Sequence, residues 1–285
     1  MVETSVIVLN YNGGRFLETC LSSVLKQDYK NYEVILVDNN SADNSVSLVK
    51  KKFPKVRILR LKENLGFTGG NNEGAKSAKA EKYLIFLNND TKVENTWLSE
   101  LVKQAESSEK IGLVNSKIYF YDSKLLNSVG GKINAFFVAK DVGFNKKDNG
   151  SYDNADIDFV CGCSFLIKKH VLEKLGYLFD PSYFIYYDDV DLSLRAKKAG
   201  YALSIAPKSI VYHYGSATMK NLSYNSVFWS TRNKYKTIIR NKKQIYLVPA
   251  LLWDFLVFVS ALIKKDKNKA KAKLDVFKWL LRRMK

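Results

Sequence analysis

The sequence has little of what disulfide-bonded, zinc-stabilised or linker-joined proteins need. Among its 285 residues are three Cys, four Pro and two His, with no Gly/Ser-rich stretch and no internal repeat. The cysteines are odd in number, and the Cys161-Gly162-Cys163 pair lacks the second pair that a structural zinc site requires. The first apolar run begins at about Ser5, which leaves no room for a signal peptide. We therefore expect reduced thiols and a cytoplasmic protein.

Charge is unevenly distributed along the chain. The formal net charge is +18, and residues 232–285 contain 16 Lys and Arg against 3 Asp and Glu. A basic tail of this kind suits either nucleic acid or an anionic membrane surface. The tail has no recognisable nucleic-acid-binding motif, so we expect no nucleic-acid partner. The length and the 46% hydrophobic content allow one large core, or one domain with an appendage.

The apolar part of the tail, residues 245–263, is close to the roughly 20 residues that span a membrane. It contains Pro249 and Asp254, and basic residues flank both of its ends, so it carries no orientation signal for a span. After a lysine-rich turn, residues 274–284 have the pattern of a basic amphipathic helix. We expect a helix pair lying in the headgroup region of an anionic leaflet. A core-facing helical pair and a single span are the alternatives.

Apolar, β-branched runs alternate with helical spacing through the first hundred residues. This order indicates βαβ units and predicts an α/β fold with a parallel, doubly wound sheet. The expected strands are residues 4–9, 33–37, 56–61 and 83–87, and the expected helices are residues 15–26, a segment ending near residue 52, residues 73–79 and residues 96–105. Residues 115–157 have no regular pattern and are interpreted as an irregular insertion.

Three of the four strands end in side chains that can bind a nucleotide. Asn10 and Tyr11 follow the first strand, Asp38 the second and Asp90 the fourth. In parallel sheets ligands bind beyond the carboxyl ends of the strands, where a carboxylate can hold Mg²⁺ or Mn²⁺ against a phosphate. The alternative is a polar turn in which Asp90 caps the following helix.

A glycine-rich loop, residues 64–72, precedes the third expected helix. Its backbone N–H groups can face phosphates at a helix N-terminus. The glycines do not have the spacing of a dinucleotide-binding fingerprint, and the loop lacks the Gly-Lys-Ser/Thr of a P-loop. The loop therefore supports a phosphate-binding role only because it lies among the polar strand ends.

Five segments, in order, resemble the motifs of family 2 glycosyltransferases, especially rhamnosyltransferase-like members. They are Ser5-Val-Ile-Val-Leu-Asn-Tyr-Asn, Val37-Asp-Asn-Asn-Ser, Asn64-Leu-Gly-Phe, Leu87-Asn-Asn-Asp-Thr and Tyr187-Asp-Asp-Val-Asp-Leu-Ser-Leu-Arg. The resemblance covers roughly residues 4–240 and implies a GT-A fold, with a Rossmann-like, mostly parallel sheet flanked by helices. It implies a nucleotide-binding half over residues 1–112 and an acceptor-binding half over residues 113–240. A basic helical tail then occupies residues 241–285.

The resemblance also implies a donor site and a metal site. Donor-binding roles fall to residues at the strand ends and in the glycine-rich loop, namely Asn10, Tyr11, Asp38, Asn40, Gly70, Asn71, Asn88 and Asn89. The family's metal motif is Asp-any-Asp, and Asn88-Asn89-Asp90 keeps only the last carboxylate. The resemblance therefore gives Mg²⁺ or Mn²⁺ to Asp90 and His213.

An acidic run at residues 188–191 supplies the expected acceptor side. The helical spacing continues to Gly200, and carboxylates at a helix N-terminus are stabilised as anions. The resemblance makes Asp189 the catalytic base and gives acceptor-binding roles to Gly162, Cys163, Asp188 and Asp191. From the residues alone, the alternatives are a capped helix with an acidic first turn and a tightly packed strand around Gly162. Fixing the helix start is a second role considered for Asp191.

Together these features predict an inverting, metal-dependent glycosyltransferase. The expected donor is dTDP-rhamnose or a UDP-sugar, and the expected acceptor is a growing or lipid-linked glycan in cell-surface polysaccharide synthesis. The tail predicts a peripheral position at the inner face of the cell membrane. The alternatives are a sugar nucleotidyltransferase and a non-catalytic, membrane-associated module that binds nucleotide sugars or glycans. The sequence makes no prediction of oligomeric state.

Overall fold

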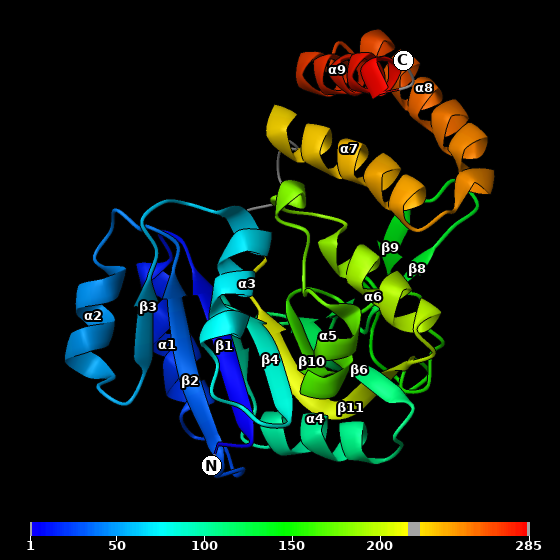
Figure 1. The fold of residues 1–285 in the computed structure, drawn as a ribbon. Helices are drawn as coiled ribbons and strands as arrows, with labels where there is room; N and C mark the ends of the chain where they lie inside the picture. Colours follow the sequence, from blue (N-terminus) through cyan, green and yellow to red (C-terminus); the bar gives the residue numbers. More distant parts are fainter. Residues whose placement is uncertain (1, 216–222, 284–285) are drawn as a thin grey trace.

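The computed structural model describes residues 2–215 and 223–283, which form a sheet covered by helices on both faces and a group of helices at one end (Figure 1). Strand and helix alternate in the N-terminal part. Its elements are β1 (Thr4–Asn10), α1 (Gly14–Val24), β2 (Tyr32–Asp38), α2 (Ser45–Lys52), β3 (Arg57–Arg60), α3 (Gly66–Ser77) and β4 (Tyr83–Asn88). The parallel order β3-β2-β1-β4 confirms the predicted doubly wound sheet.

The middle of the chain extends this sheet beyond β4 in the order β10-β6-β11-β5. Its elements are β5 (Thr91–Val93), α4 (Trp97–Glu106), β6 (Ile111–Phe120), β7 (Leu126–Ser128), β8 (Gly131–Ile133), β9 (Ala139–Asp141), β10 (Ser164–Lys168), α5 (Lys169–Leu175), the 3-10 turn Pro181–Tyr183, α6 (Asp188–Lys198) and β11 (Ala202–His213). β10 is antiparallel to β4 and β6, and β8 pairs with β9 as a separate hairpin. β1, β2, β3, β4, β6 and β11 run in one direction, so the sheet is mostly parallel.

Alternate side chains of β1 enter different cores, as expected for a strand that is covered on both faces. Val6 and Val8 join a core with α1, α2 and α4, whereas Ile7 joins a core with α3, α5 and α6. The strand register places Asn10 opposite Asp38. β4 ends beside them on the other side of β1. The polar residues that follow these three strands therefore meet at one edge of the sheet.

The predicted start of the third helix is wrong. α3 begins at Gly66 rather than near Glu73, so most of the expected glycine-rich loop is helical. Gly66 adopts a φ of +71°, which permits the turn into the helix. A Cβ atom at Gly70 would lie 2.4 Å from Leu9 Cδ1. The glycine at this position therefore allows α3 to approach β1 closely.

Residues 115–120, predicted to be irregular, belong to β6. Asn115 and Ser116 interrupt the apolar pattern of a buried strand, yet both are fully buried. Ser116 Oγ accepts a hydrogen bond from Trp97 Nε1 (3.1 Å), and Asn115 Oδ1 accepts one from Cys161 N (2.6 Å). Buried polar groups are tolerated in a strand when partners from other segments satisfy them, and those partners are not apparent from the sequence.

The C-terminal part contains α7 (Tyr224–Arg240), the 3-10 turn Gln244–Tyr246, α8 (Leu247–Ile263) and α9 (Lys267–Arg283). These helices pack on one another around a small core that includes Phe137, Tyr235, Ala250 and Val276. The predicted helix pair is confirmed, but the lysine-rich stretch after α8 is mostly the first turns of α9. Within residues 2–215 and 223–283, Gln244–Ile263 is the one helical segment long and apolar enough to cross a membrane.

Candidate active site

Asp90 and His213, far apart in the sequence, lie side by side. Asp90 stands between β4 and β5, and the pairing of β5 with β11 places Thr91 opposite His213. His213 Nε2 is 3.2 Å from Asp90 Oδ1, and both side chains are partly exposed. Burial raises the pKa of Asp90, but the hydrogen bond and charge of His213 outweigh it, so the net pKa lies below its ordinary value. Asp90 is therefore ionised at neutral pH.

The Asp90–His213 pair suits a divalent metal ion. Asn127 Oδ1 lies 3.0 Å from His213 Nδ1 and accepts its hydrogen bond. Nε2, which faces Asp90, would therefore be the nitrogen that gives up its proton to bind a metal ion, as in metal sites where a second hydrogen bond fixes the tautomer. No third Cys, His, Asp or Glu joins a cluster with them in the described part of the chain. Two protein ligands would leave most coordination positions to substrate phosphate and water.

The predicted nucleoside-binding residues form a network at the ends of β1 and β2. Asn10 Nδ2 donates to Asp38 Oδ1 (3.3 Å), and Asn89 Nδ2 donates to Asn10 Oδ1 (2.7 Å). Asn10 and Asp38 are fully buried, whereas Tyr11 is 51% exposed. Arg60 Nε lies 3.7 Å from Asp38 Oδ2. The exposed ring of Tyr11 can therefore stack on a nucleobase directly, whereas the Asp38 carboxylate is closed to solvent in this structure.

Three asparagines beside this network differ in accessibility. Asn40 is exposed, and Asn88 is half-buried at the end of β4. The sequence interpretation passed over Asn39, which is 2% exposed. Asn39 Oδ1 accepts a hydrogen bond from Leu65 N (2.9 Å), and its Nδ2 donates to Gly66 O (3.0 Å). Asn39 thus ties the end of β2 to the start of α3.

Gly70 and Asn71 were expected in a phosphate-binding loop, and that loop does not exist. Both residues are buried inside α3, and Asn71 Nδ2 donates to Phe67 O within the same helix (3.0 Å). In the first turn of α3, the N–H of Thr68 donates to Phe184 O (3.2 Å). Since these groups already have protein partners, we leave Gly70 and Asn71 out of the proposed donor site.

Asp189 lies in the first turn of α6 and is half-buried. Its Oδ2 accepts a hydrogen bond from Gly162 N (3.0 Å), and its Oδ1 accepts one from Val190 N (2.8 Å). Burial raises the pKa of Asp189 to about 6 against the opposing effect of these N–H groups, and the charge of Asp141 adds to the increase. A carboxylate with this pKa is ionised at neutral pH and is a stronger base than an ordinary aspartate.

The neighbouring carboxylates are enclosed rather than open to an acceptor. Asp188 is 4% exposed, and burial, with the charge of Asp189, raises its pKa well above its ordinary value. Asp191 is 1% exposed. Its Oδ2 accepts from Arg195 Nε (2.9 Å) and its Oδ1 from Asn241 Nδ2 (2.8 Å). This geometry favours the second role considered for Asp191, which is fixing the start of α6.

Gly162 and Cys163 connect Asp189 to the end of β4. The Gly162 N–H binds Asp189, and the Cys163 carbonyl accepts a hydrogen bond from Asn88 N (2.9 Å). The Cys163 side chain is 5% exposed. The two residues therefore place Asp189 close to Asn88, the last residue of β4. Asn88 precedes Asp90 by two residues.

Asp141, at the end of β9, is a site residue that the sequence interpretation missed. Its charge contributes to the raised pKa of Asp189, and the charge of His213 lowers the pKa of Asp141 against the larger, raising effect of burial, so Asp141 stands near both Asp189 and His213. Ser128 Oγ donates to Asp141 Oδ1 (2.7 Å). The residue lies in the stretch that was expected to be irregular, and no motif in the sequence marks it.

We expect the dependence of kcat/KM on pH to show an acid limb with its midpoint near pH 6. Asp189 must be ionised to accept a proton, and its pKa is about 6. Below that pH, the rate should fall about tenfold per pH unit. An Asp141→Asn variant should move the limb to lower pH, because a negative charge that opposes ionisation is removed. Initial rates across the limb test both expectations, and a midpoint near the ordinary aspartate pKa would contradict them.

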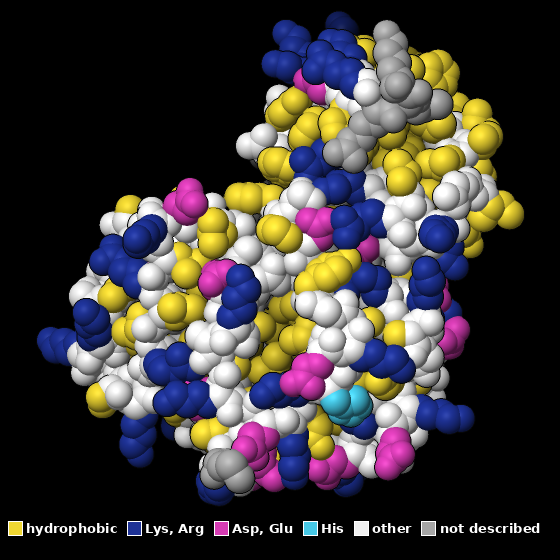
Figure 2. Space-filling view, viewed as in Figure 1, with side chains coloured by type: hydrophobic (Ala, Val, Ile, Leu, Met, Phe, Trp, Pro, Cys, Tyr) yellow, Lys and Arg dark blue, Asp and Glu magenta, His cyan; other side chains and the backbone are white. Residues whose placement is uncertain are grey.

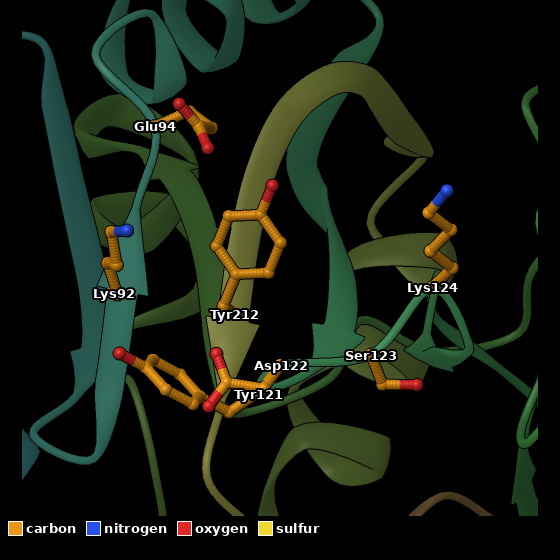
Figure 3. A pocket seen from close by; sticks show the side chains of 7 residues that line it. All are labelled: Lys92, Glu94, Tyr121, Asp122, Ser123, Lys124 and Tyr212. Carbon is orange, nitrogen blue, oxygen red and sulfur yellow. The ribbon is translucent and has the colours of Figure 1, made fainter.

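A separate hollow of about 330 Å³ lies at the β5–β11 edge of the sheet, lined by seven residues that include Lys92, Tyr121, Asp122 and Tyr212 (Figure 3). None of these described residues belongs to the predicted site. Side chains alternate along a strand, so Tyr212 and His213 point to opposite faces of β11. The hollow is therefore separate from the Asp90–His213 pair.

Comparisons with known proteins identify the family of this chain. The family model of Glycosyl transferase family 2 matches residues 5–176, more than half of the chain. The poly-beta-1,6-N-acetyl-D-glucosamine synthase of Staphylococcus epidermidis is 24% identical over 267 residues, which cover 89% of this chain and 63% of the synthase. The chain thus spans less than two thirds of the length of that relative.

Two solved structures share the fold. GalNAc-T7 with UDP, GalNAc and Mn²⁺ has a TM-score of 0.67 at 20% identity, covering 84% of this chain and 48% of that chain. TarS 1-349 of S. aureus with UDP-GlcNAc has a TM-score of 0.64 at 17% identity, covering 96% and 80%. The chain belongs to glycosyl transferase family 2 and has a GT-A fold.

Proposed function

We propose that the protein transfers a sugar, with inversion, from a pyrimidine nucleotide donor to a hydroxyl of a growing or lipid-linked glycan. The observation that carries the proposal is the short path between Asp90 and Asp189. From Asn88, two residues before Asp90, the path passes through Cys163 and Gly162 to the Asp189 carboxylate. A diphosphate held by Asp90 and His213 would therefore place the sugar near the base.

The comparisons support a nucleotide sugar as donor. UDP accompanies GalNAc-T7, and UDP-GlcNAc accompanies TarS. The synthase is named for a polymer of N-acetylglucosamine. UDP-sugars therefore stand beside dTDP-rhamnose as candidate donors, with cell-surface polysaccharide as the candidate product. Tyr11 would stack on the nucleobase, and Asn40, Asn88 and Asn89 would contact ribose or phosphate.

The proposed reaction needs one proton transfer. The acceptor oxygen attacks the anomeric carbon as the bond from that carbon to the diphosphate breaks, and Asp189 takes the hydroxyl proton. The N–H groups of Gly162 and Val190 hold the carboxylate in place during this step. Asp90 and His213 would hold Mg²⁺ or Mn²⁺, which when bound offsets the charge of the departing diphosphate. Mn²⁺ in the GalNAc-T7 structure supports this assignment.

We place the protein peripherally at the inner face of the cell membrane. The exposed apolar residues of α8 and the lysines beside them support this position. A lipid-linked acceptor would be presented at the same surface.

We expect UDP or dTDP to raise the melting temperature in the presence of Mn²⁺, and an Asp90→Ala variant to lose the Mn²⁺-dependent part of the increase. Ligands that bind only the folded state stabilise it, by about 2.7 kcal/mol at a concentration of 100 Kd. Thermal-shift measurements with UDP, dTDP and GDP, each with and without Mn²⁺, check the expectation.

An Asp122→Ala variant is the matched control, because Asp122 is exposed and lines the separate hollow. It should keep the full increase. Analysis of the product completes the test, since sugar transfer releases a nucleoside diphosphate and nucleotidyl transfer releases pyrophosphate. The absence of any increase with both pyrimidine nucleotides would reject the proposed donor.

A further inference from the structure

The outer face of α8 is a large apolar surface. The exposed fractions are 66% for Val248, 60% for Leu252, 63% for Leu256 and 77% for Ile263. Their spacing of four, four and seven residues places them on one face of the helix, and Phe255 beside them is 56% exposed. Figure 2 shows hydrophobic side chains gathered over this end of the molecule. Soluble proteins rarely leave so long an apolar stripe in water unless it contacts a partner.

Asp254, the only charged residue of α8, points away from this surface. It is 1% exposed, and its carboxylate pairs with Lys234 of α7 (2.7 Å) and Lys273 of α9 (2.8 Å). Tyr235 donates a further hydrogen bond to it (2.6 Å). Asp254 interrupts the apolar pattern of the sequence, but in the structure it joins α7, α8 and α9 from the inside. The outer face of α8 therefore carries no charge.

Lysines border the apolar face. Lys264, Lys265 and Lys267 follow α8 directly, and Lys271 is on the first turns of α9; all four are exposed. Acidic residues at this end are few and are engaged, since Asp266 pairs with Lys269 and Asp275 with Lys278. An uncharged apolar face with a basic border matches the boundary between acyl chains and anionic headgroups.

We infer that α8 docks in the plane of an anionic lipid membrane, with its outer face in the acyl boundary and the lysines of the α8–α9 turn at the headgroups. This interaction surface stands on the geometry of α8 and α9 alone. Its consequence for the acceptor, described next, rests on the proposed function.

The docking helix contacts the acceptor side of the site. Trp253 stacks on Phe136 in the turn between β8 and β9 (5.1 Å between ring centroids). The carbonyl of the adjacent Phe137 accepts a hydrogen bond from the Tyr187 hydroxyl (3.0 Å). Tyr187 immediately precedes Asp188 and the base Asp189. A membrane that holds α8 would therefore lie next to the acceptor end of the site, which suits a lipid-linked acceptor.

Two other occupants of this face fit the structure less well. If α8 spanned the bilayer, Lys234 and Lys273 would follow Asp254 into the hydrocarbon, at a high energetic cost. If a second copy covered the face, the lysine borders of the two copies would be brought together and would repel. An in-plane position in an anionic membrane avoids both costs.

Sedimentation of the full-length protein with vesicles tests the inference. We expect binding to vesicles of phosphatidylcholine and phosphatidylglycerol, and much weaker binding to phosphatidylcholine alone. A Val248→Gln/Leu252→Gln/Leu256→Gln variant should lose about tenfold or more in partitioning, because three exposed apolar side chains become polar without a change of charge. Ile239→Gln, which alters an exposed residue of α7, should bind as the native protein does.

A second pair of variants tests the basic border. Lys264→Gln/Lys265→Gln/Lys267→Gln should weaken binding to the anionic vesicles, whereas Lys50→Gln/Lys51→Gln/Lys55→Gln removes the same charge from an exposed part of the nucleotide-binding half and should not. The thermal shift with UDP and Mn²⁺ on the same variants shows that they are folded, and it tests the donor proposal separately from membrane binding.

Any one of four results would overturn the inference. The native protein could stay in solution with anionic vesicles, or the α8 variant could bind them as tightly as the native protein. Light scattering could show that the α8 variant converts a dimer to a monomer without lipid, which would assign the face to a second copy. Resistance to alkaline extraction from native membranes would indicate a span instead.

Discussion

An Asp189→Asn variant is expected to bind the donor nucleotide normally and to lose at least ~10²-fold in kcat, within the ~10²–10⁴-fold range of general base catalysis. Asparagine has nearly the same shape as aspartate and can keep one of the hydrogen bonds from Gly162 and Val190. It cannot accept the proton of the acceptor hydroxyl. Since the change affects only the transition state, kcat should fall while nucleotide binding does not.

The measurement is the rate of nucleoside diphosphate release, with the UDP-induced thermal shift recorded on the same preparation. Asp122→Asn makes the same chemical change at an exposed site outside the proposed machinery, so it should keep native turnover. Unchanged turnover in Asp189→Asn would remove Asp189 from the role of base. A simultaneous loss of nucleotide binding would instead indicate a structural defect.

An Asp254→Asn variant is expected to destabilise the C-terminal helices by about 3–5 kcal/mol, the cost of breaking a buried ion pair. The carboxylate serves both Lys234 and Lys273, and the neutral asparagine leaves both buried ammonium groups without a charged partner, although Lys273 keeps an acceptor in Thr231 Oγ1 (2.8 Å). Burial lowers the pKa of Lys234 and the charge of Asp254 offsets this only in part. The cluster thus already holds more positive than negative charge, and losing the carboxylate is costly.

Hydrogen exchange of the α8 and α9 amides measures this effect locally. Asp266→Asn is the matched control, because the ion pair of Asp266 with Lys269 is partly exposed to solvent. Asparagine can also keep the capping hydrogen bond that Asp266 accepts from Lys269 N (3.0 Å). It should leave the protection of both helices nearly unchanged. Native protection in Asp254→Asn would show that the internal ion cluster does not hold the three helices together.

If Asp254 does hold these helices together, the membrane surface and the acceptor side depend on the same cluster. The cluster fixes α8 against α7 and α9, and α8 in turn contacts the β8–β9 turn through Trp253 and Phe136. Loss of the cluster should therefore weaken vesicle binding as well as the protection of the helices. Vesicle binding and hydrogen exchange, measured on the same variant, therefore relate the stability of the C-terminal helices to the proposed position of the protein at the membrane.

The strand ends illustrate what a local pattern can predict. Asn10, Asp38 and Asp90 were identified because an apolar run stops at each of them, and parallel strands bring their carboxyl ends to one edge. The pairing of Asp90 with His213 was expected only from the family resemblance, because 123 residues separate them and no local periodicity relates the two. The register of β5 against β11 supplies the physical reason for their contact.

The glycine-rich segment and the acidic run illustrate where such patterns are ambiguous. Glycines at residues 66, 69 and 70 are equally compatible with a phosphate-binding loop and with a helix that packs closely on a strand, and only the position of Leu9 distinguishes the two. Asp188, Asp189 and Asp191 are chemically identical in the sequence. Their partners, supplied by distant segments such as Gly162 and Asn241, leave Asp189 half-buried as the proposed base and enclose Asp191.

The sequence by itself determined the order of strands and helices in the first hundred residues, the polar residues at the strand ends and the basic, apolar character of the tail. These features follow from local periodicity, composition and charge. Tertiary structure alone decided the direction of Asp254, the raised pKa of Asp189, the role of Asp191 and the site position of Asp141. Each of these depends on burial and on partners brought together from segments that are far apart in the chain.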